Sequence, residues 1–438
     1  MALPASPLYL GLDFGTGGAR ACLIDAHGAV VWQGRTDYLR AEEQTPADWL
    51  AALRRVLEML PTPLRGRLAG IAVDGTSATV LLTDAISRPL GPALLYKDDR
   101  AAAGLAQLEA AYRSAHPAAA LPHYLSATSG LAKFHWLMRQ PKAAGAARFC
   151  HQADWITARL SGRAGLSDYH NALKTGYDVR AQSWPEWIAC LPHAALLPTV
   201  VMPGMDLGTV SADAARRFDL PPACRVRAGT TDSIAAFLAA GAREPGEGVT
   251  SLGTTLALKL LSRRRVEAVE YGVYSHWFGP LWLAGGASNA GGGVLRQFFS
   301  DAQLQALSRR IDPDVSNGLD YYPLPAPGER FPVNDPAHLP RLTPRPPDDA
   351  LFLQGLLEGL ARIEAAGYAR LTLLGATPPE RILSAGGGAA NETYNRIRAR
   401  LLKVPVAPAL HAEASYGSAL LARDGSGIFV SAATGKPR

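Results

Sequence analysis

The chain has 438 residues, of which 48% are hydrophobic and 19% charged, a composition typical of a packed soluble protein that excludes a largely disordered one. Because a single hydrophobic core stops growing at about 250–300 residues, this length predicts two domains. The net charge of +6 is spread along the chain, which favours a small anionic ligand such as a nucleotide over a nucleic acid.

The sequence predicts no membrane span, no secretion signal and no cysteine-based site. No uninterrupted apolar run reaches about 18 residues, so no membrane-spanning helix is predicted. The first eleven residues, MALPASPLYLG, have no basic segment before their apolar stretch, and we therefore expect no signal peptide and a cytoplasmic protein. No C-x-x-C pair occurs, so we expect neither a disulfide framework nor a zinc site, and we expect reduced, mostly buried thiols at Cys22, Cys150, Cys190 and Cys224.

The first quarter of the chain alternates short apolar runs with turns. The segment Asp25–Gly28 supplies turn chemistry between two apolar runs, which predicts an antiparallel hairpin. The stretch TPADWLAALRRVLEML predicts a helix that begins at Thr45 and Pro46. A further apolar run, LAGIAVDG, follows it. Hairpin strands followed by a helix and another strand predict an α/β fold with a mixed sheet.

A similar pattern begins again halfway along the chain. Residues 224–242, CRVRAGTTDSIAAFLAAGA, predict a strand, a Gly-Thr turn and a helix. Residues 248–262, GVTSLGTTLALKLLS, predict a hairpin similar to that of residues 10–25, LGLDFGTGGARACLID. Between them these segments indicate a duplicated α/β unit, although a chance similarity between two short hairpins remains the alternative.

The last third of the chain contains a proline-rich segment followed by regular elements. The basic run Arg263–Arg265 before it is expected to be a solvated hairpin end. Pro323–Pro347 is too rich in proline to form a helix or a central strand. A long helix is predicted for residues 348–371, and residues 381–406 predict a strand, a glycine-rich turn, a helix and a strand.

The tripeptide Asp13-Phe14-Gly15 matches the DFG motif of protein kinases, but its position excludes that function. A protein kinase needs its glycine loop, lysine strand and catalytic loop before DFG, and only twelve residues precede Asp13. The Walker A motif is absent because the only Gly-Lys pair, Gly435-Lys436, is followed by Pro437. The turn after Asp13 also lacks the last glycine of G-x-G-x-x-G.

Two Gly-Thr turns remain as candidate phosphate sites. Such a turn exposes backbone N–H groups and a hydroxyl, and a carboxylate just before it can hold Mg²⁺ through its water shell. The first turn, with Gly15 and Thr16, carries such an acid in Asp13, whereas the second turn does not; its candidate residues are Gly253, Thr254 and Thr255. We predict that the first turn positions metal and the second binds phosphate, each having a plain tight hairpin as its alternative.

Asp232 lies at the start of a predicted helix, where the helix dipole stabilises an ionised carboxylate. It is either a helix cap or, beside a phosphate site, the carboxylate that accepts a hydroxyl proton during phosphoryl transfer. Glycine-rich turns at 285–293, with Asn289 and Gly291, and at 385–391 would let the backbone approach a nucleotide closely. Polar side chains suited to sugar hydroxyls follow strands in the first half, and the candidates are Ser77, Asp98 and Arg100.

The order of these segments resembles that of the FGGY carbohydrate kinases from about Tyr9 to Leu421, nearly the whole chain. The resemblance rests on ten ordered blocks, among them GLDFGTGGARACLID, GIAVDGTSATVLLTD, AGTTDSIAAFLAAG, SLGTTLALK and SAGGGAANETYNRIRARLLKVPV. It implies two α/β domains of the ribonuclease-H-like (actin-like ATPase) fold with a cleft between them. We expect an N-terminal, sugar-binding domain at residues 1–228 and a C-terminal, ATP-binding domain at residues 229–438.

The resemblance also assigns roles by position. It implies that Asp13 and Thr16 lie at the magnesium and γ-phosphate site, that Asp232 is the general base, and that Thr254 and Thr255 bind phosphate. Sugar contacts are implied for Ser77, Asp98 and Arg100, and adenosine contacts for Gly387, Gly388 and Asn391. The sequence departs from the family pattern at Tyr96, where many members have Trp, and at Gly130, where Ser, Thr or Pro is expected three residues before Lys133.

The blocks GTTDSIAAF, SLGTTLALK and SDYHNALKTGYD are similar to those of the small D-ribulose kinases. The sequence therefore predicts an ATP- and Mg²⁺-dependent kinase that phosphorylates a ketopentose such as D-ribulose at its terminal hydroxyl. D-xylulose, L-ribulose or glycerol kinase activity is the alternative, as is a non-transferring, actin-like nucleotide-binding regulator. The expected partners are a small sugar and ATP, with no nucleic acid or membrane, for a protein that acts as a monomer or homodimer.

Overall fold

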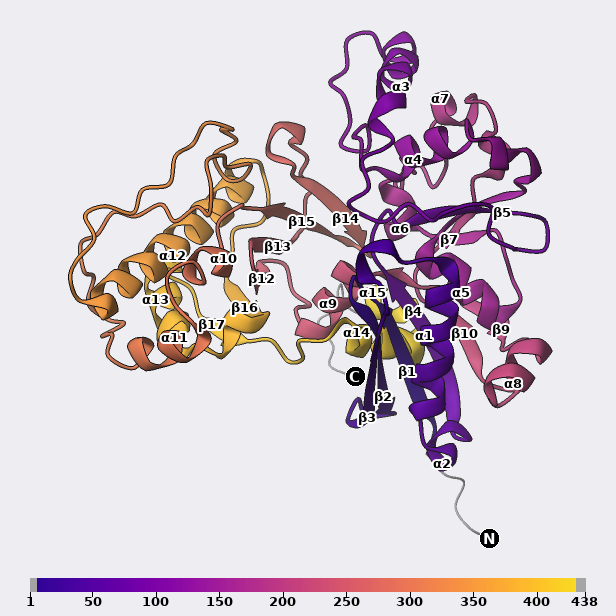
Figure 1. The fold of residues 1–438 in the computed structure, drawn as a ribbon, viewed down its shortest axis with the longest axis horizontal. Helices are drawn as coiled ribbons and strands as arrows, with labels where there is room; N and C mark the ends of the chain where they lie inside the picture. The colour runs from indigo at the N-terminus through magenta and orange to yellow at the C-terminus, as the bar shows by residue number, and fades with distance from the viewer. Residues whose placement is uncertain (1–5, 431–438) are drawn as a thin grey trace. The chain divides into compact units, whose positions relative to one another are not determined.

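The computed structural model describes residues 6–430, which form two compact units (Figure 1). The first unit runs to Ala239 and also contains Glu413–Ile428, whereas the second comprises Ala240–Ala412 and resumes at Phe429. This division differs from the expected boundary after residue 228, because helix α9 (Asp232–Ala240) belongs almost entirely to the first unit. The described residues do not include residues 1–5, where no signal peptide is expected, or the Gly435-Lys436 pair.

The first unit is built on a mixed sheet of seven strands. Its order is β3-β2-β1-β4-β10-β9, and β11 pairs with β4. The bounds are β1 (Leu8–Phe14), β2 (Gly18–Asp25), β3 (Val30–Asp37), β4 (Leu68–Gly75), β9 (Asp206–Thr209), β10 (Arg225–Arg227) and β11 (Thr230–Thr231). The hairpin pairs β1–β2 and β2–β3 are antiparallel, whereas β1, β10 and β11 each run parallel to β4. The expected mixed sheet is therefore confirmed.

Helices cover both faces of this sheet. Alternate residues of β1, from Leu8 to Phe14, share a core with Trp49 of α1 (Pro46–Met59), the helix that the sequence predicts, and Thr45 caps it as expected. Residues on the other face of β1 meet α14 (Ala414–Asp424), which packs on β1, β2 and β4 (Figure 1). Because side chains alternate along a strand, Asp13 lies on the face that α14 covers.

Two smaller sheets and several helices complete the first unit. Their strands are β5 (Val80–Thr83) with β6 (Arg148–His151), and β7 (Leu166–Asp168) with β8 (Thr199–Val201). The helices are α2 (Thr62–Arg65), α3 (Ala102–Ala115), α4 (Gly130–Leu137), α5 (Gln152–Ser161), α6 (Tyr169–Leu173), α7 (Glu186–Ala189) and α8 (Ala212–Phe218). A separate apolar core joins α3, α4 and α7, with Phe134 and Trp187 buried in it.

The second unit repeats the pairing pattern of the first. Its sheet has the order β14-β15-β13-β12-β16-β17. The bounds are β12 (Glu247–Leu252), β13 (Leu256–Ser262), β14 (Tyr274–Phe278), β15 (Leu281–Ala287), β16 (Arg381–Ala385) and β17 (Val406–Pro408). The path β15-β13-β12-β16-β17 contains two antiparallel and then two parallel pairings, as does β3-β2-β1-β4-β10. The duplicated α/β unit predicted from the two hairpins is thus confirmed.

The helices of the second unit also follow the predictions. The long helix α12 (Asp349–Leu373) buries the leucine face expected of it, and α13 (Glu392–Leu402) lies beside it (Figure 1). Short helices α10 (Gly292–Leu295) and α11 (Asp301–Ser308) precede the proline-rich segment, and α15 (Gly427–Val430) ends the described chain. Residues 323–347 contain isolated β-bridges but neither a helix nor a strand, as expected.

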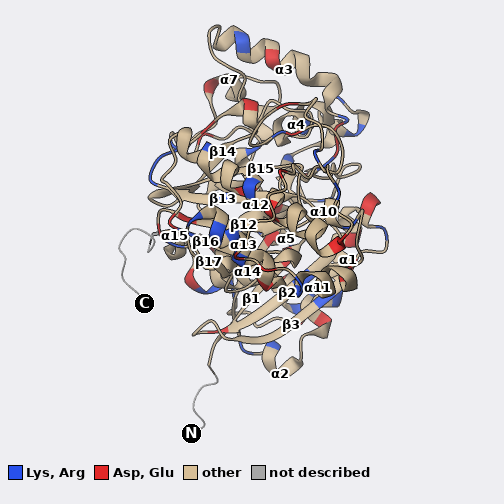
Figure 2. Ribbon diagram, turned by 90° about the vertical axis from the view of Figure 1, so that its left-hand side faces the viewer, with Lys and Arg blue, Asp and Glu red and all other residues tan. Residues whose placement is uncertain are grey.

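Three further expectations concern the surface and the thiols. All four cysteines are free, and those at 22, 150 and 224 are buried, which confirms the prediction. Arg263–Arg265 are exposed just after β13, and basic and acidic residues are interspersed along the chain in Figure 2. Within residues 6–430, no helix has both the length and the apolar character needed to cross a membrane.

Candidate active site

Three acidic residues lie at the carboxyl ends of adjacent parallel strands in the first unit. Asp13 of β1 is paired in register with Asp74 of β4. Thr230 of β11 is paired with the same Asp74, and α9 begins two residues later at Asp232. In open α/β sheets, ligands bind outside the carboxyl ends of the strands, so this edge is the candidate site.

Asp13 is buried, with 2% of its surface exposed. Its Oδ2 accepts a hydrogen bond from Nη1 of Arg20 at 3.0 Å, and Arg20 also lies 3.5 Å from the carboxylate of Glu413. Oδ1 of Asp13 has no hydrogen-bond partner among the described residues. A buried carboxylate oxygen left without a donor is a position at which a cation or a protonated ligand group would be stabilised.

Asp74, near the end of β4, is a second buried acid. Its Oδ2 accepts a hydrogen bond at 2.6 Å from the hydroxyl of Ser418 on α14, and within the described chain Oδ1 has no partner. Burial, and then repulsion by Asp13, raise the pKa of Asp74 well above its usual value, and the charge of Asp232 adds to this effect. The three acids therefore lie close enough to interact electrostatically.

Asp232 is the first residue of α9 and is half-buried. Its Oδ1 accepts a hydrogen bond from the backbone N–H of Ser233 at 2.6 Å. Such a contact at a helix N-terminus favours the ionised carboxylate, as a proton acceptor requires. The cap-like contact and the role of a base are thus compatible at this residue.

The first Gly-Thr turn is a tight hairpin between β1 and β2. The backbone N–H of Gly15 donates to the carbonyl of Gly18 at 3.0 Å, and the side chain of Gln44 donates to the carbonyl of Thr16 at 2.7 Å. Trp49 in turn donates to Gln44 at 3.0 Å. Thr16 itself is exposed, so its hydroxyl and the adjoining turn are available to a ligand of the size of a phosphate.

The sugar-site candidates lie on two loops of the first unit. Ser77 follows β4, and its buried Oγ has no hydrogen-bond partner among residues 6–430. Asp98 and Arg100 instead bind each other, with Arg100 Nε 3.0 Å from both carboxylate oxygens. Although burial raises the pKa of Asp98, hydrogen bonds from Arg100 lower it below its usual value overall. The guanidinium of Arg100 also lies over the ring of Trp136, 5.4 Å from its centroid.

The three glycine-rich turns of the second unit, which the sequence treats separately, meet in the structure. Gly292 N–H donates to the carbonyl of Gly253 at 2.8 Å, and Gly293 N–H donates to that of Thr254 at 3.0 Å. A Cβ atom at Gly291 would lie 2.5 Å from the Thr254 carbonyl oxygen, and one at Gly386 would lie 3.0 Å from that of Leu252. These close approaches require glycine, and the side chains of Thr254 and Thr255 remain exposed.

Two asparagines proposed from the sequence have their side chains engaged by the protein. The Asn289 amide donates to the Gly328 carbonyl at 3.0 Å. Asn391 accepts from the backbone N–H of Tyr394 and donates to Ser308, so it is the N-cap of α13. Of the adenosine candidates, Gly387 faces open space, whereas Gly388 packs against Leu252.

The acids of this edge can be tested for their fit to Mg²⁺. No group of three or more His, Cys, Asp and Glu side chains within residues 6–430 is arranged to hold a metal ion. Mg²⁺ bound with nucleotides, however, usually takes one or two carboxylates and completes its shell with water and phosphate oxygens. Asp13, with its unpartnered Oδ1, provides such a carboxylate, so the residues present fit this ion.

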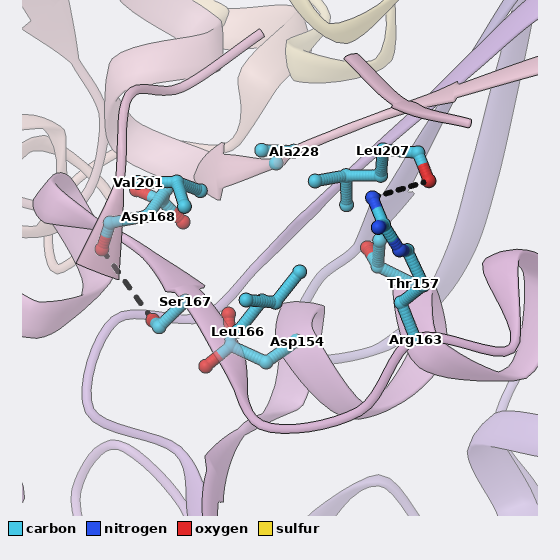
Figure 3. Close-up of a pocket in the computed structure, with 10 residues that line it drawn as sticks. Asp154, Thr157, Arg163, Leu166, Ser167, Asp168, Val201, Leu207 and Ala228 are labelled. Carbon is cyan, nitrogen blue, oxygen red and sulfur yellow. Dashed lines mark hydrogen bonds between the residues drawn. The ribbon is translucent and has the colours of Figure 1, made fainter. Parts of the chain in front are cut away.

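A small cavity in the first unit lies behind the turn that leads to Asp232. Its volume of about 10 Å³ has room for roughly one water molecule, which excludes a sugar. Asp154, Ser167 and Asp168 line it, and Figure 3 shows Arg163 reaching across to the carbonyl of Leu207 at 3.2 Å.

Comparisons with known proteins agree with this geometry. Residues 8–239 match the N-terminal domain, and residues 248–423 the C-terminal domain, of the FGGY family of carbohydrate kinases. A xylulose kinase from Streptomyces coelicolor is 32% identical over 279 residues, which cover 60% of this chain and 56% of that enzyme, a little over half of its length. A glycerol kinase from Rhodospirillum rubrum is 27% identical over 98% of this chain and 92% of its own. A crystal structure described as a xyloylose kinase from Brucella ovis superposes with a TM-score of 0.83 at 25% identity, covering 97% of this chain and 92% of its own. The chain therefore belongs to the FGGY family of carbohydrate kinases.

Proposed function

We propose that the protein is an ATP-dependent kinase that phosphorylates the terminal hydroxyl of a ketopentose, with D-ribulose as the first candidate and D-ribulose 5-phosphate as the product. The observation that carries this proposal is the convergence of Asp13, Asp74 and Asp232 at one sheet edge of the first unit. Acids gathered at such an edge, one of them with a raised pKa, support phosphoryl transfer to an alcohol in a member of a carbohydrate kinase family.

In the proposed reaction, Asp232 accepts the proton of the sugar hydroxyl. The hydroxyl oxygen forms a bond to the γ-phosphorus of ATP as the bond between that phosphorus and the bridging oxygen of ADP breaks. Asp232 lies at the N-terminus of α9, where the helix dipole favours a negative charge. Burial and the charge of Asp13 raise the pKa of Asp74, which disfavours a second negative charge at a site that must receive phosphate.

Phosphate binding is proposed for the two Gly-Thr turns. Thr16 on the first turn and Thr254 and Thr255 on the second have exposed side chains beside glycine backbone. Backbone N–H groups and hydroxyls in such turns bind phosphate oxygens without a formal charge. Magnesium beside Asp13, when bound, would neutralise charge on the phosphate oxygens.

The second candidate acceptor is D-xylulose, because the Streptomyces relative and the Brucella structure are described as kinases of that sugar. D-ribulose and D-xylulose differ only in the configuration at one carbon, so one or two hydrogen bonds separate the two activities. L-ribulose and glycerol are further candidate acceptors, and the same assay tests them.

A coupled assay of ATP consumption over D-ribulose, D-xylulose, L-ribulose and glycerol tests the proposal. The expected result is sugar-stimulated turnover with the highest kcat/KM for D-ribulose. A higher value for D-xylulose would support the second candidate. Equal ATP turnover with and without every acceptor would contradict a sugar kinase and favour a nucleotide-binding regulator of the same fold.

A further inference from the structure

Lys133 is a lysine of α4 whose side chain is fully buried in the first unit. Its ammonium group donates to three backbone carbonyls, those of Ala78 at 2.8 Å, Leu95 at 2.7 Å and Tyr96 at 3.2 Å. A protonated lysine has three N–H donors, so the three acceptors satisfy the group completely.

The three carbonyls belong to two different loops that carry the sugar-site candidates. Ala78 directly follows Ser77, and Tyr96 lies two residues before Asp98. Ala78 has a φ of 61°, a left-handed conformation that costs energy for a residue other than glycine. Between these loops, Val80 and Leu94 exchange both of their backbone hydrogen bonds. Lys133 therefore joins the two loops that carry Ser77 and Asp98.

We infer that Lys133 is a positioning residue for the phosphate acceptor, because it fixes the spacing between Ser77 and the Asp98–Arg100 pair and so sets the affinity for the sugar. The inference rests on the proposed function, in which Ser77 and Asp98 contact the sugar. Its consequence is specific: loss of the ammonium group should weaken acceptor binding and leave nucleotide binding and the chemical step nearly unchanged.

A purely space-filling role would not require a charged group here. Burying an ammonium group is costly, and the same volume is filled at lower cost by Met or Leu unless the carbonyls need donors. Burial lowers the pKa of Lys133 to about 7, while the charge of Asp98 raises it and that of Lys174 lowers it further. Every donor of Lys133 is bound to a loop carbonyl. The cost of burying this lysine is best explained by the relative position of the two loops that these hydrogen bonds maintain.

Gly130 shows how closely α4 is fitted to its neighbours. A Cβ atom at Gly130 would lie 2.2 Å from Oγ1 of Thr175, and Thr175 itself is hydrogen-bonded to His151 at 3.0 Å. Gly130 N–H also donates to the carbonyl of Lys174 at 2.9 Å. A larger residue at position 130 would therefore meet Thr175, so Gly130→Ala offers a second way to displace Lys133 without removing its charge.

The test compares Lys133→Met with Lys142→Met, a matched change at an exposed lysine. Steady-state kinetics with the best acceptor should show an acceptor KM raised at least about 10-fold in Lys133→Met, from the loss of hydrogen bonds made by a charged donor. The KM for ATP and kcat should stay within about twofold, as should all three constants in Lys142→Met. Lys133→Arg should not rescue binding, because the planar guanidinium cannot reproduce the three donors of an ammonium group.

Gly130→Ala tests the same inference if Lys133→Met does not fold. Gly130→Ala should also raise the acceptor KM. This rise should be smaller when Thr175→Ala is present as well, as measured by comparing Gly130→Ala/Thr175→Ala with Thr175→Ala alone. An unchanged acceptor KM in the folded Lys133 variant, or an equal rise in the KM for ATP, would overturn the positioning role. A wild-type protein that phosphorylates none of the sugars would instead remove the proposed function, and the inference with it.

Discussion

Asp13 on β1 and Asp74 on β4 occupy paired positions on two adjacent parallel strands, and both side chains are almost completely buried. Arg20 and Ser418 each bind one oxygen of the pair, and the other oxygen of each carboxyl has no partner among the described residues. Two neighbouring buried acids destabilise a fold unless a ligand, a metal or a proton compensates them. Such an arrangement is typical of a functional site.

Replacing Asp13 tests the proposed binding of Mg²⁺. Asp13→Asn removes the negative charge but keeps the shape, so the Mg²⁺ concentration that gives half-maximal activity should rise and kcat should fall. Titration of activity with MgCl₂ measures both effects, and Asp37→Asn on exposed β3 is the control. An unchanged metal dependence would contradict the role of Asp13.

Replacing Asp232 should affect chemistry and leave binding intact. Asp232→Asn cannot accept the hydroxyl proton, so kcat should fall by about 10²–10⁴, the usual contribution of a general base. Calorimetric titration of the variant with the acceptor should give a dissociation constant near that of the wild type. Near-normal turnover would mean that another group takes the proton.

Gly387 allows a direct test of nucleotide contact. A Cβ atom there meets no protein atom within 4 Å, so Gly387→Ala should leave the melting temperature nearly unchanged. If adenosine packs on this glycine, the added methyl group should raise the KM for ATP severalfold without changing the acceptor KM. A variant with wild-type kinetics for both substrates would place the adenosine elsewhere.

Asp168 should make stability depend on pH. Burial, and then the charge of Asp154, raise the pKa of Asp168 to about 7, whereas in the unfolded chain it is about 3.9. Folding therefore favours the protonated acid, and the stability that it contributes is complete below about pH 4 and is lost as the pH rises through 7. Asp168→Asn keeps a residue able to cap α6 but does not titrate.

The free energy of unfolding, measured in urea at pH 5 and pH 8, tests this prediction. The variant should gain stability relative to the wild type as the pH rises between these values. His151, the ionisable partner of Asp154, is present in both proteins, so its titration contributes to both. A stability difference that does not change with pH would contradict a protonated Asp168 in the folded protein.

The buried ion pair of the second unit should be essential to its stability. Arg398 of α13 and Glu364 of α12 are both fully buried and 2.7 Å apart, and they bind Ser384 of β16 and Thr250 of β12. Arg398→Leu leaves the charge of Glu364 buried without its partner and should cost about 3–5 kcal/mol in the free energy of unfolding.

An exposed pair gives the matched control. Arg345→Leu removes the partner of Asp349 on the surface and should cost no more than about 1 kcal/mol. Chemical denaturation of both variants and of Glu364→Leu/Arg398→Leu measures the difference, and the double variant should be more stable than Arg398→Leu. Equal losses in the buried and exposed pairs would contradict the prediction.

The sequence by itself determined the elements whose signals are local. The helix after Thr45 and Pro46, the two Gly-Thr hairpins, the long leucine-faced helix at 349–373 and the repeated α/β order were all predicted, because caps, turns and apolar periodicity act over a few residues. Asp13, Asp232 and the Gly-Thr turns of the candidate site were predicted from such local signals, whereas Arg20, Glu413 and Ser418 were not.

Only the tertiary structure decided which of these residues meet and in what state. Ser418 binds Asp74 from 344 positions away, Asn391 is used as a helix cap, and α9 carries Asp232 into the first unit. Atoms brought together from distant parts of the chain raise the pKa of Asp74. They also provide the hydrogen bonds of Lys133 to two loops and the close contact that a Cβ atom at Gly130 would make. Burial and electrostatic interaction are properties of that packing, and local sequence patterns do not encode them residue by residue.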